Sequence, residues 1–195
     1  INDLIDINID KKIKRTETRP LTAKKITKKE ALFLLLIILT ISLIILFQFN
    51  QKAIIIALTS MPLIILYPLM KRYTHWPQLF LGIIFNWGVI IISFQFFETF
   101  KLEFIILYIG CIFWTLAYDT IYAYQDRKDD IINGVKSTAV LLGDSGLIYI
   151  KIFYLLFFSI IGYLSLSLLR FLRFATRERI KTPTEETGES QKKPL

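Results

Sequence analysis

The chain has 195 residues, of which 54% are hydrophobic, and its mean hydropathy is +0.51. The apolar residues gather in runs close to the roughly 20 residues that a helix needs to cross a bilayer, which excludes a soluble globular domain. The formal net charge is +8, with most of the excess outside these runs. A single cysteine excludes an intramolecular disulfide, and a single histidine excludes a metal site built from several imidazoles.

Basic residues crowd the start of the chain and favour a membrane flank over a nucleic-acid surface. Nine lysines and arginines lie between Lys11 and Lys29, directly before the first apolar run. Nucleic-acid binding is the alternative interpretation, but a basic cluster beside a span more often marks its cytoplasmic side. The chain opens with Ile1 and not with methionine, and we expect it to lack an amino-terminal portion.

The pattern predicts an all-α, polytopic transmembrane bundle. Five spans are expected, with uncertain ends, at residues 31–49, 53–70, 79–97, 102–118 and 145–169. Threading the chain up and down places three polar segments, residues 1–30, 71–78 and 119–138, on one side of the membrane. Their lysines and arginines predict that this side is cytoplasmic or faces the matrix. Residues 1–174 form the predicted membrane domain, and the polar residues 175–195 are expected to be a disordered tail.

The first polar segment opens with an acidic cluster. Asn2, Asp6 and Asp10 are spaced four residues apart and would share one face of a helix, where like charges repel. A cation on that face would remove the repulsion, and oxygen ligands without histidine or cysteine suit a hard ion such as Mg²⁺.

A second acidic cluster continues directly from the fourth span. At about 100° per residue, Asp119, Asp126 and Asp130 also fall on one helical stripe. Either cluster alone could be a hydrophilic loop between spans. Two helix-phased stripes on the same side of a membrane, each at the end of a span, instead indicate a functional site.

Basic residues accompany both stripes: Arg15, Arg19, Lys71, Arg72 and Lys136. Acidic and basic groups together predict a site for a metal and a diphosphate, because Mg²⁺ bridges carboxylates to phosphate oxygens while Arg and Lys balance the remaining charge. The apolar interior beyond would accept a long hydrocarbon tail.

The motifs resemble those of the UbiA-type intramembrane prenyltransferases, most closely their 4-hydroxybenzoate branch. The matching segments are Asn2–Asp10, Arg15–Leu21, Tyr67–Gln78, Phe85–Gly88, Asp119–Asp130 and Gly134–Thr138. The Tyr122–Ala123 pair favours the hydroxybenzoate branch over the haem and menaquinone branches. Ala23 and Lys24 depart from the small Ser-Gly turn usual in the family.

The resemblance implies a bundle of about nine helices that moves a polyprenyl group from its diphosphate to 4-hydroxybenzoate, for ubiquinone synthesis, in a bacterial or mitochondrial inner membrane. It implies Mg²⁺ ligands at Asn2, Asp6, Asp10, Asp119, Asp126 and Asp130. Diphosphate contacts are implied for Arg15, Lys71, Arg72 and Lys136, with Tyr122 beside them. The residues expected to be catalytic are Asp6, Asp10, Asp126, Asp130 and Arg72.

Two alternatives to an active prenyltransferase stay open. Helices are expected to be missing on both sides of the five spans, so the chain could be an inactive remnant that keeps the motifs without a closed site. A small cation transporter that uses the acidic stripes is disfavoured, because its carboxylates would be expected near the middle of the membrane and not at the ends of spans.

Overall fold

The computed structural model describes residues 2–13 and 15–181. Within these residues the secondary structure is helical and contains no strand, which confirms the predicted fold class. In chain order the elements are α1 (Asn2–Asp10), α2 (Lys28–Leu46), α3 (Gln51–Thr59), α4 (Met61–Tyr73), α5 (Pro77–Phe85), α6 (Trp87–Phe97), α7 (Leu102–Asn133), α8 (Thr138–Leu142), the 3₁₀ helix η1 (Gly143–Ser145) and α9 (Gly146–Lys181).

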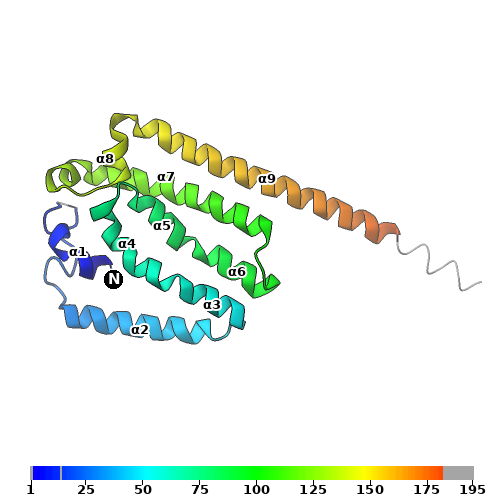
Figure 1. The fold of residues 1–195 in the computed structure, drawn as a ribbon, viewed down its shortest axis with the longest axis horizontal. Helices are drawn as coiled ribbons and strands as arrows, with labels where there is room; N and C mark the ends of the chain where they lie inside the picture. Colours follow the sequence, from blue (N-terminus) through cyan, green and yellow to red (C-terminus); the bar gives the residue numbers. More distant parts are fainter. Residues whose placement is uncertain (1, 14, 182–195) are drawn as a thin grey trace, which may run out of the picture.

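The described residues contain five helical segments long and apolar enough to cross a membrane, as predicted. They are α2, the pair α3–α4, the pair α5–α6, α7, and the stretch from α8 into α9. The segments run up and down in alternation (Figure 1). Helix α9 continues to Lys181, into the segment predicted to be disordered, and residues 182–195 of that tail lie outside the described residues.

Two of the spans are interrupted at polar residues. The second span turns at Ser60, where Pro62 occupies the first turn of α4, the helical position that best tolerates a missing backbone N–H. The third breaks at Asn86, whose side-chain amide donates to Gly82 O and to Thr115 Oγ1, both at 2.8 Å. Asn86 therefore satisfies the Gly82 carbonyl in the last turn of α5 and joins the break to α7, within the membrane where water is absent.

Helices extend further into the polar segments than the sequence predicts. Residues 119–133 belong to α7, which ends only at Gly134, a glycine in the left-handed region with φ 67°. Likewise α4 extends to Tyr73 and α5 begins at Pro77, so the connection between them is short. The second acidic stripe is therefore carried by a continuous helix that begins in the membrane.

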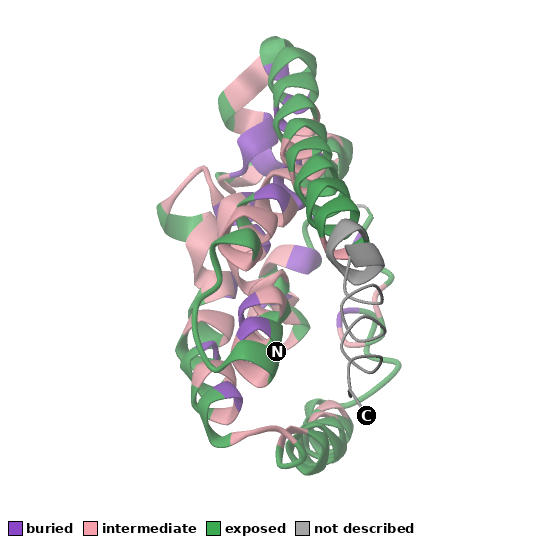
Figure 2. Ribbon diagram, turned by 90° about the vertical axis from the view of Figure 1, so that its right-hand side faces the viewer, coloured by how far each residue is buried: buried purple, intermediate pink, exposed green. Residues whose placement is uncertain are grey.

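The core lies between α7 and α9. Leu116 and Ala117 from α7 pack against Ile150 and Phe153 from α9, and all four are buried. In contrast, α2 has no buried residue and stands apart at the edge of the bundle (Figures 1 and 2). The packing therefore fixes α7 firmly and leaves the apolar face of α2 exposed.

The three polar segments meet at one end of the bundle. Helix α1 lies beside the end of α4, and the start of α5, the end of α7 and α8 lie at that same end (Figure 1). The helices therefore bring the three polar segments to the same end of the bundle, and the side of the membrane that this end faces stays a prediction.

Close packing at the start of α9 makes a glycine necessary there. A Cβ on Gly146 would lie 1.6 Å from Tyr124 Oη, a hydroxyl that donates to Gly143 O at 2.6 Å. We expect Gly146→Ala to displace the tyrosine ring and to destabilise the fold by about 1–3 kcal/mol, the usual cost of overpacking. The measurement is the melting temperature of the detergent-solubilised protein.

The control for this prediction is Gly162→Ala on the same helix, where a Cβ meets no atom within 4 Å. Because alanine favours helix over glycine, this variant should melt at or slightly above the temperature of the unmodified protein. Equal melting temperatures for Gly146→Ala and Gly162→Ala would contradict the packing argument.

Candidate functional site

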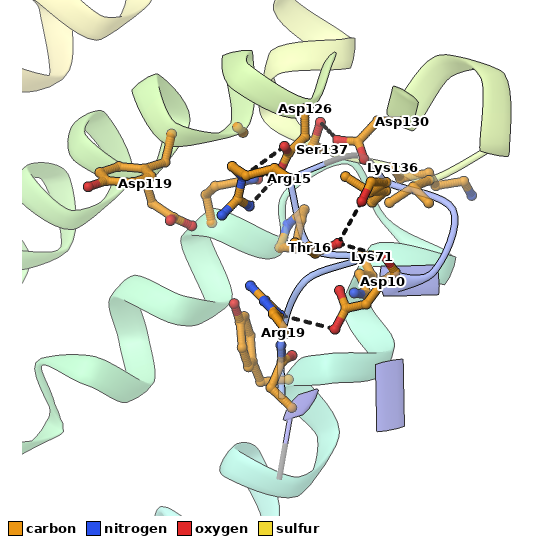
Figure 3. A pocket seen from close by; sticks show the side chains of 18 residues that line it. Asp10, Arg15, Thr16, Arg19, Lys71, Asp119, Asp126, Asp130, Lys136 and Ser137 are labelled. Atoms are coloured by element: carbon orange, nitrogen blue, oxygen red, sulfur yellow. Dashed lines mark hydrogen bonds and ion pairs between the residues drawn. The ribbon is translucent and has the colours of Figure 1, made fainter. Parts of the chain in front are cut away.

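A cavity of about 300 Å³ opens where the polar segments meet. Residues from α1, the following loop, α4, α5, α7 and the α7–α8 connection line it (Figure 3). Of the residues singled out in the sequence as site residues, those that line the cavity are Asn2, Asp10, Arg15, Lys71, Asp119, Tyr122, Asp126, Asp130 and Lys136. The structure thus brings both acidic stripes to one cavity.

The residues of the first acidic stripe, on helix α1, lie in two different environments. Asn2 and Asp10 line the cavity, whereas Asp6 is fully buried and does not line it. Lys71 Nζ from α4 lies 2.5 Å from Asp6 Oδ2, and Asp6 Oδ1 has no hydrogen-bond partner among the described residues. Burial raises the pKa of the Asp6 carboxyl, and Lys71 opposes that rise.

Helix α7 presents the second stripe as its periodicity predicts. Asp119, Asp126 and Asp130 all face the cavity, and Tyr122 lies on the same side. Asp119 precedes Asp126 by about two turns, or roughly 10 Å along the helix axis. The stripe therefore runs from the membrane span toward the end of the bundle where the polar segments meet.

The loop after α1 places arginines between the two stripes (Figure 3). The Arg15 Nε lies 2.9 Å from Asp126 Oδ1 and its Nη2 lies 2.5 Å from Oδ2, which makes a bidentate ion pair. The two residues are 111 positions apart in the sequence. This bond to Asp126 raises the pKa of the Arg15 guanidinium. Arg19 Nη1 bonds Asp10 Oδ2 at 3.1 Å and Asp3 Oδ1 at 3.0 Å. Each arginine therefore neutralises a carboxylate of the site.

Two residues predicted to act in the site lie outside the cavity lining. Asp6 is the buried partner of Lys71, and Arg72 is exposed on α4. Adjacent positions on a helix differ by about 100°, so the backbone that turns Lys71 toward the cavity turns Arg72 away from it. The role expected for Arg72 at a diphosphate is thus not supported by its position.

Arg19, one of the basic residues that accompany the first acidic stripe in the sequence, also lines the cavity. Four other polar lining residues were not predicted as site residues: Thr16, Tyr67, Gln78 and Ser137. All four belong to the segments that carry the family resemblance, which is the signal that could have identified them. Thr16 closes the end of α1, since its Oγ1 donates to Asp10 O at 2.9 Å. Lys136 lines the cavity, but its Nζ donates to Tyr73 O at 3.1 Å.

The cavity residues fit Mg²⁺ by their donor chemistry. Asn2, Asp10 and the three carboxylates of α7 offer oxygen ligands, and the buried Asp6 Oδ1 is a further unpaired oxygen. In the described part of the chain no three acidic, histidine or cysteine side chains converge closely enough to hold an ion. Arg15 pairs with Asp126 and Arg19 pairs with Asp10, so a metal bound at either of these two carboxylates would compete with its ion pair.

Comparison with known proteins identifies the family. The UbiA prenyltransferase family matches residues 1–176. The chain belongs to this family. A solved apo structure of a UbiA homolog from Aeropyrum pernix K1 superimposes with a TM-score of 0.69 at 26% identity, covering 82% of this chain and 61% of that chain. The predicted UbiA-like membrane fold is thereby confirmed.

Relatives of this UbiA-family chain come from animals, plants and bacteria. It is 45% identical over 74% of its length to the mitochondrial 4-hydroxybenzoate polyprenyltransferase of Aedes aegypti, of which it covers 33%. It is 43% identical over 78% of its length to 4-hydroxybenzoate geranyltransferase 1 of Lithospermum erythrorhizon, covering 50% of that protein. For the 4-hydroxybenzoate octaprenyltransferase of Pasteurella multocida the identity is 42%, over 85% of this chain and 58% of the relative. The chain therefore spans between about a third and three fifths of these relatives.

Proposed function

We propose that the chain forms the catalytic part of an enzyme that transfers a polyprenyl group from its diphosphate to 4-hydroxybenzoate, with Mg²⁺ as cofactor. The observation that carries the proposal is the meeting of two acidic helices, α1 and α7, with basic side chains at one cavity at the end of a membrane bundle. The names of the relatives support the aromatic acceptor and the prenyl donor.

In this proposal the carboxylates hold the metal and the basic groups contact the diphosphate. Asn2 and Asp10 on α1, supported by Asp6, and Asp119, Asp126 and Asp130 on α7 would hold the metal, which when bound neutralises charge on diphosphate oxygens. Arg15, Lys71 and Lys136 line the same cavity and would contact the diphosphate as it leaves. Fixed positive charge in a water-poor site stabilises a leaving anion far better than water does.

The proposed reaction requires no protein nucleophile. The bond between the prenyl carbon and the diphosphate oxygen breaks, and its electron pair leaves with the diphosphate. The ring carbon ortho to the hydroxyl of 4-hydroxybenzoate then forms the new carbon–carbon bond and releases its proton. We place the cavity end of the bundle on the cytoplasmic or matrix side of an inner membrane, in line with the basic residues gathered there.

The test is prenyl transfer in membrane fractions that contain this chain, with radiolabelled 4-hydroxybenzoate and a polyprenyl diphosphate. We expect labelled prenyl-4-hydroxybenzoate with Mg²⁺ and none with EDTA. Absence of product, while a homologous enzyme is active in the same membranes, would reject activity for this chain and favour an inactive remnant. Uptake of a cation into vesicles without any product would favour the transporter alternative.

A further inference from the structure

The connection between α7 and α8 is tied to three neighbouring helices. Lys136 N donates to Lys71 O at the end of α4, at 3.0 Å. Thr138 N donates to Gln78 Oε1 on α5 at 3.0 Å, and the hydroxyls of Thr138 and Thr120 on α7 are 2.8 Å apart. Thr138 and Thr120 have no exposed surface. Buried and fully bonded polar groups of this kind fix the backbone of the connection.

Ser137 sits at the centre of this framework and reaches the acidic stripe. Its hydroxyl oxygen accepts from Val140 N at 3.3 Å, which caps α8, and the hydroxyl donates to Asp130 Oδ2 at 3.2 Å. Ser137 is 4% exposed and Asp130 is 5% exposed, so no bulk water competes for this bond. Figure 3 shows the bond at the rim of the cavity.

We infer that Ser137 is a positioning residue that sets the orientation of the Asp130 carboxylate toward the metal and diphosphate. The inference rests on the proposed function. A carboxylate at the end of a side chain with two torsions can turn away from a ligand, and a hydrogen bond to one oxygen holds its rotamer while the other oxygen stays available. Outer residues that orient metal ligands in this way typically contribute 10–100-fold to metal affinity or activity.

Ser137 also caps α8, and the two roles predict different outcomes for different substitutions. Alanine removes both the cap and the donor to Asp130. Glycine removes the donor but is nearly as good as serine at a helix N-cap. Threonine keeps both functions. A role in positioning therefore predicts that alanine and glycine behave alike, whereas a role confined to capping predicts that glycine behaves like serine.

The test measures binding of Mn²⁺ in the presence of inorganic diphosphate, by electron paramagnetic resonance on the detergent-solubilised chain. We expect Ser137→Ala and Ser137→Gly each to weaken binding on the order of tenfold, and Ser137→Thr to bind within about twofold of the unmodified protein. In an Asp130→Asn background, Ser137→Gly should cause no further loss. Melting temperatures establish that each variant is folded, and Ser137→Gly tests the inference even if Ser137→Ala does not fold.

Two results would overturn the inference alone: binding by Ser137→Gly equal to that of the unmodified protein, or an equal loss from Ser137→Gly in the Asp130→Asn background. Failure of the unmodified chain to bind Mn²⁺ with diphosphate would instead overturn the proposed function, and this inference with it. The two failures are therefore distinguishable in one experiment.

Discussion

Asp126→Ala is expected to lower prenyl transfer to 4-hydroxybenzoate by on the order of 10²–10³-fold, the loss typical when one fixed electrostatic group is removed from an active site. Asp126 is the carboxylate that bridges the two halves of the cavity, because it lies on α7 and pairs with Arg15 from the loop after α1. Its loss would remove an oxygen ligand for Mg²⁺ and would also release Arg15 from its position. The measurement is product formation over a range of Mg²⁺ concentrations.

The matched control is Asp129→Ala. Asp129 lies on the same helix three residues later and does not line the cavity, so this variant should keep most of the activity. If a folded Asp126→Ala protein were as active as Asp129→Ala, the acidic stripe of α7 would take no part in the proposed mechanism. Because Asp126 is paired at the surface end of α7, we expect both variants to remain folded in the membrane.

Lys71→Met is expected to destabilise the protein by about 3–5 kcal/mol, the usual cost of removing one partner of a buried ion pair. Asp6 has no exposed surface, and Lys71 Nζ is the cation 2.5 Å from its carboxylate. Methionine keeps the length of the side chain but removes the ion-pair partner of the buried Asp6 carboxylate. Arg72→Met is the control, because Arg72 is the exposed neighbour on the same helix.

The stability loss of Lys71→Met should depend on pH. Burial already raises the pKa of Asp6 above its ordinary value of 3.8, and Lys71 opposes that rise, so its removal raises the pKa further. A carboxyl whose pKa is higher in the folded state favours folding as the pH falls through that pKa, since the folded state then binds the proton more tightly. The deficit should be largest at neutral pH and should shrink toward pH 3.8.

Thermal melting at several pH values in EDTA measures this effect. The double variant Asp6→Asn with Lys71→Met should recover much of the lost stability at neutral pH, because neither charge remains. A deficit that stays constant with pH, or a double variant no more stable than Lys71→Met, would mean that the methionine disturbs packing and not the charge balance of Asp6.

Local periodicity determined much of this protein from the sequence. The five spans follow from runs of apolar residues, whose length must match the bilayer. The helical phase of Asp119, Asp126 and Asp130 also follows from spacing alone, since the backbone of one continuous helix places residues seven and eleven positions apart on one face. Spacing did not predict that the third span breaks at Asn86.

Only the tertiary structure decided which charges meet. The pairing of Arg15 with Asp126, of Lys71 with Asp6, and the bond from Ser137 to Asp130 join different elements. Local sequence rules carry no information on such distances, because these depend on how the packing of α7 against α9 and of α1 against α4 orients each helix. The sequence by itself determined the membrane class and the two acidic stripes, whereas the choice of Lys71 over Arg72 came from packing, which turns one face of α4 inward.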